Sequence, residues 1–265
     1  MNNPMFPCRI RDYTNFSLFH HRHLDGHLVS MHQSGSNWVK HLLAMVLAKE
    51  FGLPEPDNIH DNRIVTHPNS PTPYAGIPKL AQSHNIPSPL LAPLAQAGMI
   101  KLPPVILLVR DMRNVLESHY AKLASLYRVP FSEFLRAEPA SKRYDKDIWW
   151  DIRFLNCWHA LLQRVPQRIC LVRYETLRAS PLEEMRRILG FVGLSAVSDE
   201  TIRYAIEASS KEAMKAKDKS ADGYEVVRIS SEAPLSRYSE EDKAYFKEIC
   251  ARYLHHDFGY RYQDW

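Results

Sequence analysis

The sequence predicts an α/β protein in which a central, mainly parallel sheet is flanked by helices. Three short apolar segments, each followed by a segment of helical periodicity, carry this prediction. Such short apolar runs are typical of strands buried on both faces of a sheet, and strand–helix repeats favour parallel strands. A length of 265 residues is within the range of one α/β domain with its own core, so we expect a single domain over 1–265.

Four segments are expected to form strands. Three are clear, and the fourth, which is weaker, lies within a segment that is otherwise irregular. In chain order they are 27–32 (HLVSMH), the weaker 79–84 (KLAQSH), 105–110 (VILLVR) and 169–174 (ICLVRY).

Helical patterns follow the three clear strands. The first runs over 36–51, where apolar residues recur at the spacing of one helix face. In the third, Pro181 suits a first helical turn, and Gly193 lies just past the end. The remaining expected helices are 114–127, 181–194 and 239–256.

Two segments are expected to be irregular. Residues 54–104 contain eleven of the 18 prolines, and proline removes a backbone donor and blocks the helical turn. Because the strand at 79–84 fixes the middle of this segment, we expect ordered loops over a pocket. Residues 211–234 carry mixed charge and a glycine, which is typical of a mobile loop or lid.

The charge and the hydropathy pattern narrow the class of partner. A net charge of +4 is too small to argue for nucleic acid, although it suits an anionic small ligand. The chain has no apolar stretch of membrane-spanning length, and its first residues lack the layout of a signal peptide. We therefore expect a cytoplasmic protein with no nucleic-acid or membrane partner. Either a monomer or a homodimer is expected.

The cysteines and histidines do not indicate a metal site. The four cysteines lie far apart and form no Cys-x-x-Cys pair, so reduced, mostly buried thiols are expected. The thirteen histidines include no His-x-x-x-His helix with a carboxylate partner. We expect no metal.

The first candidate binding loop lies between the strand at 27–32 and the helix at 36–51. The turn contains Gly35, which lets a ligand approach the backbone closely. The first amides of a helix lack intrahelical partners and lie at the positive end of its dipole. The residues therefore permit an anion site, although an ordinary helix cap stays open as the alternative. It is not a Walker loop, because the Gly-x-x-x-x-Gly-Lys-Ser/Thr pattern is absent.

Two further strand ends carry polar groups. The strand at 105–110 ends on Arg110, and Ser118 follows about two helical turns later. These two side chains are suited to grip a phosphate, although Arg110 paired with Asp111 or Glu117 as scaffold is the alternative. The strand at 169–174 ends on Arg173 and Tyr174, at the sheet edge where α/β proteins bind ligands.

Together, these segments resemble the sulfotransferases that use 3′-phosphoadenosine 5′-phosphosulfate (PAPS). The loop His-Gln-Ser-Gly-Ser-Asn-Trp (32–38) is similar to the family's Pro-Lys-Ser-Gly-Thr-Thr-Trp loop. LLVRDMRNVLESHY (107–120) resembles the family's Arg-Asp-x-x-Asp-x-x-x-Ser-x-Tyr segment. RYETLRASPLEEMRRILGFVGL (173–194) is similar to its Tyr-Glu-Asp segment, AQSHNIP (81–87) to its Lys-Thr-His-Leu-Pro segment and SSKEAMKA (209–216) to its Thr-Ser-Phe-Lys-Glu-Met segment. The resemblance covers about 27–260 in the same order, and it implies a nucleotide-kinase-like fold.

The resemblance also implies roles for particular residues. PAPS is expected as the sulfate donor and adenosine 3′,5′-bisphosphate as the by-product, with no metal. His84 is expected to be the general base, since histidine has a suitable pKa. The loop that ends at Trp38 is expected to bind the phosphosulfate and to contact the adenine. Arg110 and Ser118 are expected to bind the 3′-phosphate, and later segments are expected to make the other contacts with the adenine. The residues expected to bind the donor are Gln33, Ser34, Gly35, Ser36, Asn37, Trp38, Arg110, Ser118, Tyr174, Ser209, Met214 and Arg228.

The sequence departs from the family pattern at the loop. Gln33 occupies the position of the lysine that contacts the oxygen bridging sulfur and phosphorus, and an amide donates only a neutral hydrogen bond to that oxygen. The Gly-x-x-Gly-Asp-Trp-Lys end of the family's last motif is also missing after Arg228. The candidates to supply the missing charge are His32, Lys40, Lys101 and Lys215.

The residues leave the acceptor and two rival functions open. The expected acceptor is a small molecule that offers a hydroxyl or an amine. The rivals are a weak or inactive protein that binds PAPS or its product, and a small-molecule kinase. Aromatic residues favour an apolar or ring-bearing acceptor, and acidic residues a cationic one. The aromatic residues are Tyr74, Tyr120, Tyr127, Phe131, Trp149 and Trp150, and the acidic residues are Asp57, Asp61 and Glu117.

Overall fold

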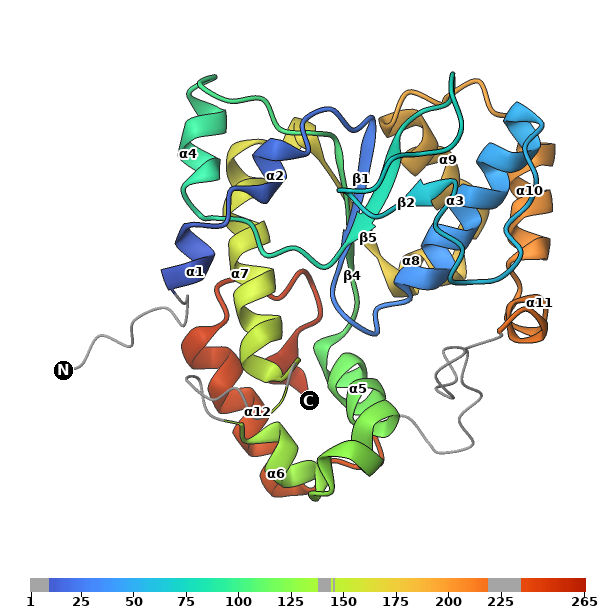
Figure 1. Ribbon diagram of the computed structural model, residues 1–265. Coiled ribbons are helices and arrows are strands. Elements are labelled where there is room, and N and C mark those ends of the chain that lie inside the picture. Colours follow the sequence, from blue (N-terminus) through green and yellow to red (C-terminus); the bar gives the residue numbers. More distant parts are fainter. Residues whose placement is uncertain (1–9, 138–143, 145, 219–234) are drawn as a thin grey trace.

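A parallel sheet of five strands forms the centre of the computed structural model, which describes residues 10–137, 144, 146–218 and 235–265. The strands lie in the order β2-β3-β1-β4-β5, and every neighbouring pair is parallel (Figure 1). Their bounds are β1 Gly26–Ser30, β2 Val65–Thr66, β3 Leu80–Ser83, β4 Val105–Val109 and β5 Ile169–Arg173.

Helices cover both faces of the sheet, and the strands are apolar because both of their faces are buried. Ile106 and Leu108 of β4 pack against α3, α9 and α10, whereas Val105, Leu107 and Val109 pack against α5, α7 and α12. The first layer consists of α3 Ser36–Phe51, α8 Tyr174–Ala179, α9 Pro181–Phe191, α10 Asp199–Ala208 and α11 Lys211–Ala216. The second consists of α1 Ile10–Tyr13, α2 Ser17–His20, α4 Leu91–Gln96, α5 Met112–Tyr127, α6 Phe131–Leu135, α7 Ile148–Arg164 and α12 Glu240–Tyr253.

The α/β fold and its parallel sheet are confirmed. The four expected strands are each shorter by one or two residues, and the helices expected at 36–51, 114–127, 181–194 and 239–256 correspond to α3, α5, α9 and α12. The two-residue strand β2 was not expected. Residues 54–104 contain short elements only, as their prolines require. The expectation of a loop over 211–234 is wrong for 211–216, which form α11, with Ser210 accepting a hydrogen bond from the Ala213 amide. Of that segment, 219–234 lie outside the described residues.

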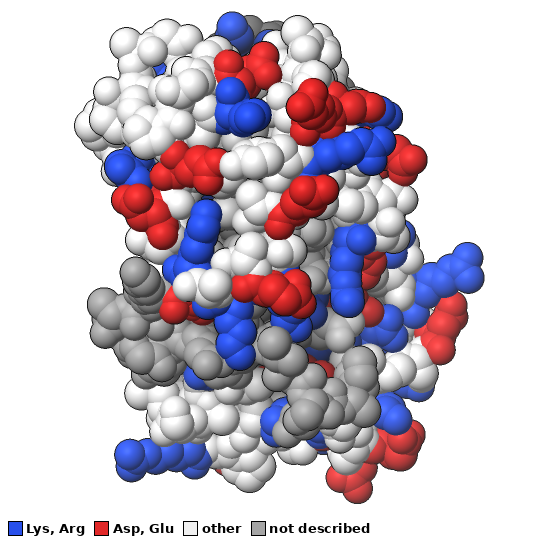
Figure 2. All heavy atoms as spheres, turned by 90° about the vertical axis from the view of Figure 1, so that its right-hand side faces the viewer, with Lys and Arg blue, Asp and Glu red and all other residues white. Residues whose placement is uncertain are grey.

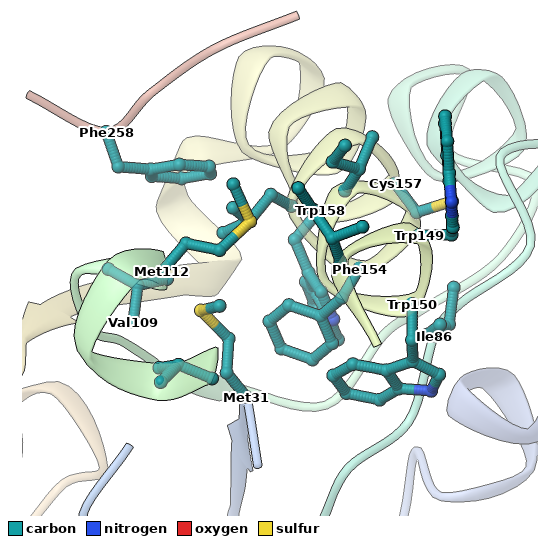
Figure 3. Packing of buried hydrophobic residues seen from close by; sticks show 14 of the residues in the cluster. Met31, Ile86, Val109, Met112, Trp149, Trp150, Phe154, Cys157, Trp158 and Phe258 are labelled. Carbon is teal, nitrogen blue, oxygen red and sulfur yellow. The ribbon is translucent and has the colours of Figure 1, made fainter. Parts of the chain in front are cut away.

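Helix α7 was not expected, and it fills much of the core. Trp150, Phe154 and Trp158 lie on one of its faces, next to Met31 at the end of β1 (Figure 3). The sequence pattern did not indicate this helix, because charged residues lie at buried positions between the apolar ones. One of them, Arg153, donates to the Asp12 carboxylate of α1 at 2.8 Å, and both side chains are buried.

The distribution of charged side chains on one face of the molecule agrees with the small net charge of the chain. On the face that shows α10 and α11, Lys and Arg side chains alternate with Asp and Glu, so that face has no continuous basic surface among its described residues (Figure 2). Within the described ranges, no helix is long and apolar enough to cross a membrane.

Cys157, Cys170 and Cys250 are buried free thiols, and Cys8 lies outside the described residues.

The buried Arg153–Asp12 pair makes a testable contribution to stability. Replacing Arg153 by methionine keeps the apolar stem but removes the buried guanidinium that pairs with the Asp12 carboxylate, which costs about 3–5 kcal/mol. Arg186→Met is the matched control, because the Arg186–Asp199 pair is exposed and contributes little. Urea unfolding of the two variants should show a large loss for Arg153→Met and almost none for Arg186→Met. Equal losses would contradict this account of α7.

Candidate active site

The residues that follow four strands meet at one edge of the sheet and form the candidate site. Because neighbouring strands are parallel and in register, their carboxyl ends lie side by side. The chain places His84 after β3, the loop 31–35 after β1, Arg110 after β4 and Tyr174 after β5. This is the edge at which open α/β sheets bind ligands.

The loop 31–35 has an unusual backbone. Gln33 has φ 55° and Gly35 has φ 87°, both in the left-handed region that favours glycine. A non-glycine residue in this conformation costs about 1 kcal/mol or more, so its surroundings have to hold it there. The Ser34 hydroxyl donates to the Met31 carbonyl at 2.6 Å and is buried. Ser34 was expected to donate to a ligand, whereas in this structure its proton stabilises the loop.

Helix α3 begins directly after this loop and has no side-chain cap. Gly35 is its N-cap residue and offers no side chain to the first amides of the helix. The alternative of an ordinary cap by Ser34 or Ser36 is therefore wrong. Ser36 and Asn37 occupy the first turn, and Asn37 is half-buried. The uncapped first turn of a 16-residue helix faces the loop with the positive end of its dipole.

Arg110 links the loop to the neighbouring elements. Its Nη1 donates to the Gln33 carbonyl at 2.7 Å and lies 3.5 Å from the Ser118 hydroxyl. Its guanidinium lies 4.9 Å from the centre of the Tyr174 ring. The expected Arg110–Ser118 neighbourhood is therefore present, and the same guanidinium holds the strained residue Gln33 in place.

The alternative that Arg110 serves an ion pair with its acidic neighbours is wrong. Asp111 forms its ion pair with Arg113 at 2.7 Å. The Glu117 carboxylate accepts hydrogen bonds from the backbone amides of Leu235 and Arg237, at 2.8 and 3.2 Å.

Tyr174 lies between the loop and helix α3. A Cβ atom at Gly35 would lie 2.6 Å from the Tyr174 ring, so only glycine fits there. The Trp38 ring lies edge-on to Tyr174, with 5.9 Å between ring centres. The expected donor-binding residues Gln33, Gly35, Trp38, Arg110, Ser118 and Tyr174 thus form one cluster.

A pair of histidines lies next to this cluster. The His32 and His84 rings are stacked, with their centres 3.8 Å apart, and the Trp150 ring lies edge-on to His32 at 4.8 Å. His32 is itself a loop residue and directly precedes Gln33, so the loop connects this pair to the cluster. Trp150 was considered only as an aromatic residue near the pocket, and His32 only as a source of charge.

The hydrogen bond of His84 determines its tautomer. Nδ1 lies 2.9 Å from the Ser30 carbonyl oxygen, which can only accept. Nδ1 therefore carries the proton, and Nε2 keeps the lone pair that a general base needs. Burial lowers the pKa of His84, the bond to Ser30 opposes this effect, and the charge of Lys146 adds to it. His84 is consequently neutral at pH 7.

His32 and Lys101 were two of the candidates for the cation that replaces the loop lysine. The surroundings of His32 and the position of Lys101 rule them out. Burial, followed by the neighbouring charges, lowers the pKa of His32 far below its ordinary value, so it is uncharged at neutral pH. Lys101 precedes β4 and therefore lies at the opposite, amino edge of the sheet.

Two lysines stay as candidates, with different surroundings. Lys40 donates to the Asn62 side chain at 3.0 Å, and burial lowers its pKa to about 8. Lys215 is exposed on α11.

Two more residues that were expected to bind the donor, Ser209 and Met214, lie on the side of the sheet that α3 covers. The Ser209 hydroxyl lies 2.7 Å from Nδ1 of His41, one turn after Trp38 on α3, and both residues are buried. Met214 is buried in α11. Arg228 lies outside the described residues. No group of His, Cys, Asp or Glu among the described residues is arranged to hold a metal ion.

The acidic residues considered for a cationic acceptor have other partners. Asp57 and Asp61 both form ion pairs with Arg63, and Glu117 holds the backbone at 235–237. The hypothesis that these three carboxylates select a cationic acceptor is therefore not supported.

Comparisons with known proteins identify the family and agree with the fold. A family model described as a sulfotransferase domain matches residues 25–265. A search of curated proteins found no match. Mouse sulfotransferase SULT7A1, solved in complex with PAP, has a TM-score of 0.54 at 14% identity, covering 91% of this chain and 88% of that one, and it shows the same fold. Retinol dehydratase matches in two structures, with TM-scores of 0.45 (retinol and PAP) and 0.41 (androsterone and inactive cofactor PAP). Their identities are 15% and 16%, and both cover 86% of this chain and 78% of theirs.

Gly35 provides a direct test of the packing in this site. Gly35→Ala should strain a left-handed residue and push Tyr174 away, whereas Gly52→Ala adds a left-handed alanine with no atom within 4 Å. We expect a loss of about 1–2 kcal/mol for Gly52→Ala from backbone strain alone. The loss for Gly35→Ala should be clearly larger in urea unfolding. Indistinguishable losses would show that Tyr174 does not pack on Gly35.

Proposed function

The chain belongs to the sulfotransferase domain family, and we propose that it moves a sulfuryl group from PAPS to a hydroxyl or amine of a small molecule. The by-product is adenosine 3′,5′-bisphosphate. The cluster of Arg110, Ser118 and Tyr174 beside the loop at Gly35 carries this proposal. It combines a cation, a hydroxyl and an aromatic ring at the edge of the sheet where ligands bind.

The donor is bound by groups that this chain already holds close together. The first turn of α3 faces the phosphosulfate with its uncapped amides. Arg110 offers guanidinium donors and Ser118 a hydroxyl, which suit a 3′-phosphate. Trp38 and Tyr174 offer ring faces and edges to the adenine. PAP, with which the mouse neighbour was solved, is this same by-product.

The acceptor is activated by His84. Its Nε2 takes the proton of the acceptor O–H or N–H group as that oxygen or nitrogen forms a bond to sulfur. The bond between sulfur and the bridging oxygen breaks, and its electron pair leaves with the bisphosphate. Nδ1–H stays bonded to the Ser30 carbonyl, which keeps the ring oriented while the imidazolium forms. The chemistry resembles phosphoryl transfer, in which the protein mainly positions groups and neutralises charge.

Gln33 supports the alternative function, in which the protein binds the donor but transfers sulfate weakly or not at all. Its amide offers the bridging oxygen a neutral hydrogen bond, and a charge-assisted bond is about twice as strong. A turnover assay with labelled PAPS separates the two functions. The kinase alternative has no comparable support, because the family is that of the sulfotransferases.

Arg110 predicts which nucleotide binds. Adenosine 3′,5′-bisphosphate should raise the melting temperature more than 5′-AMP does, because only the former has a phosphate for Arg110 and Ser118. Arg110→Ala should bring the two shifts together, and Arg22→Ala, an exposed control before β1, should not. Equal shifts for both nucleotides in the native protein would overturn the assignment of this site.

His84 predicts a pH profile. His84→Ala should abolish transfer and leave nucleotide binding nearly intact, whereas His23→Ala, an exposed control, should change neither. Because burial lowers the pKa of His84, the neutral base persists below the ordinary value of about 6.5. The transfer rate should therefore hold as the pH falls through that value and decline only at more acidic pH. Normal turnover by His84→Ala would identify another base.

A further inference from the structure

Side chains occupy the first amides of helix α5, which begins directly after Arg110. The Asp111 amide donates to the Glu175 carboxylate at 3.2 Å. The Met112 amide donates to the Tyr262 hydroxyl at 3.1 Å. The next amide along the helix donates to the Asp111 carboxylate at 2.9 Å. These three amides are therefore already used, unlike those of the uncapped first turn of α3, so a phosphate beside α5 has to be bound by side chains.

The Glu175 side chain extends the pairing of strands β4 and β5 beyond the end of the sheet. Asp111 and Glu175 are 64 residues apart in the chain, which is the separation of every pair of facing residues in these two strands. A carboxylate oxygen thus takes the place of a backbone acceptor in the same register. It links the residue directly after Arg110 to the residue directly after Tyr174.

The second oxygen of Glu175 is bonded to the C-terminal segment, residues 257–265. The Tyr260 hydroxyl donates to this oxygen at 2.7 Å, and the Tyr260 side chain is buried. Burial, together with the charge of Glu175, raises the pKa of Tyr260, so its hydroxyl keeps the proton and stays a donor. Each oxygen of the carboxylate therefore has its own partner, and rotation of the carboxylate would break both contacts.

Other contacts hold Tyr260 in place independently of Glu175. Nη2 of Arg113 donates to the Tyr260 carbonyl at 3.4 Å. The same guanidinium lies 5.5 Å from the centre of the Tyr262 ring and 5.4 Å from that of Trp265. On the other side, the Arg173 guanidinium lies 4.4 Å from the centre of the Tyr260 ring. The C-terminal segment thus presents Tyr260 to Glu175 from a fixed position.

Arg110 depends on the position of this strand end because it contacts three other elements at once. It donates to the Gln33 carbonyl at 2.7 Å, and its guanidinium lies 4.9 Å from the centre of the Tyr174 ring. Its distance of 3.5 Å from the Ser118 hydroxyl is at the outer limit of a hydrogen bond. A small shift of the backbone at 110–111 would therefore separate the two groups that are suited to bind one phosphate.

We propose that Glu175 and Tyr260 are positioning residues that aim Arg110 at the 3′-phosphate and so set the preference for nucleotides that carry this group. This inference rests on the proposed function, and it makes the C-terminal segment a part of the donor site. Tyr260 orients the carboxylate, the carboxylate holds the Asp111 amide, and that amide fixes the backbone from which Arg110 extends. In this arrangement neither positioning residue has to contact the nucleotide.

The first test compares two nucleotides that differ only in the 3′-phosphate. Calorimetry should show that Glu175→Ala weakens binding of adenosine 3′,5′-bisphosphate about tenfold, because two hydrogen bonds are lost, and leaves 5′-AMP binding nearly unchanged. Tyr260→Phe should cause a smaller loss with the same selectivity, and it provides the test if Glu175→Ala does not fold. Glu175→Gln should keep most of the affinity, since its amide oxygen still accepts from Asp111 and its NH2 group donates to Tyr260.

Tyr204→Phe is the matched control for Tyr260→Phe. The Tyr204 hydroxyl also donates to a glutamate, Glu55, but both side chains are exposed. The Tyr204 ring lies 4.9 Å from Nζ of Lys49, which is in the last turn of α3, at the opposite end of this helix from the loop 31–35. Tyr204→Phe therefore removes the same kind of hydrogen bond away from the site, and it should change the affinity for neither nucleotide.

The second test asks whether the pair acts through Arg110. In the Arg110→Ala protein, the further change Glu175→Ala should not alter the affinity for adenosine 3′,5′-bisphosphate, because no guanidinium is left to position. In the Glu175→Ala protein, Tyr260→Phe should likewise have no further effect, because its partner is already absent. Losses that simply add up would show independent contributions of these residues and would overturn the inference.

The outcomes separate the inference from the proposed function. If the native protein prefers adenosine 3′,5′-bisphosphate to 5′-AMP and Glu175→Ala and Tyr260→Phe keep that preference, the inference is wrong and the function stands. Equal weakening of both nucleotides also overturns the inference, because Glu175 would then support the fold or the adenine contacts alone. If the native protein binds neither nucleotide, both the inference and the proposed function are wrong.

Discussion

The hydrogen bond from Arg110 to the Gln33 carbonyl is the interaction on which the candidate site depends. At 2.7 Å, it connects the end of β4 to a loop residue whose left-handed backbone is otherwise unfavourable. The loop conformation lets Gly35 approach the Tyr174 ring and leaves the first turn of α3 uncapped. One side chain thus connects the three neighbouring strand ends that form the proposed nucleotide side of the site. A bound 3′-phosphate would compete with the Gln33 carbonyl for this guanidinium, so donor binding and loop conformation are coupled.

The histidine pair supplies the general base in the proposed transfer. A general base has to be neutral before it accepts a proton, and burial keeps His84 in that form while Ser30 fixes its tautomer. The stacked His32 ring restricts the rotation of His84 without bringing a competing charge, since its own burial also keeps it neutral. In this chain the residue before Gln33 therefore packs against the proposed base, His84.

The sequence allowed prediction of the parallel sheet, the four helices with clear periodicity and the cluster at the strand ends. These features arise from local patterns, namely short apolar strands and a glycine loop before a helix. Helix α7 escaped prediction because its buried face includes Arg153 and Asp151, whose placement depends on Asp12 and on the core rather than on neighbours in the chain. The His32–His84 stack escaped it for the same reason, because it depends on a contact between two segments that lie more than fifty residues apart.

A crystal structure with adenosine 3′,5′-bisphosphate tests the central claim most directly. The account predicts the 5′-phosphate at the first turn of α3, the adenine at Trp38 and Tyr174, and Arg110 turned from the Gln33 carbonyl to the 3′-phosphate next to Ser118. It also predicts that Nε2 of His84 faces the space in which the sulfuryl group of PAPS would lie. A nucleotide bound elsewhere, with Arg110 still on the Gln33 carbonyl, would contradict the assignment of this cluster as the donor site.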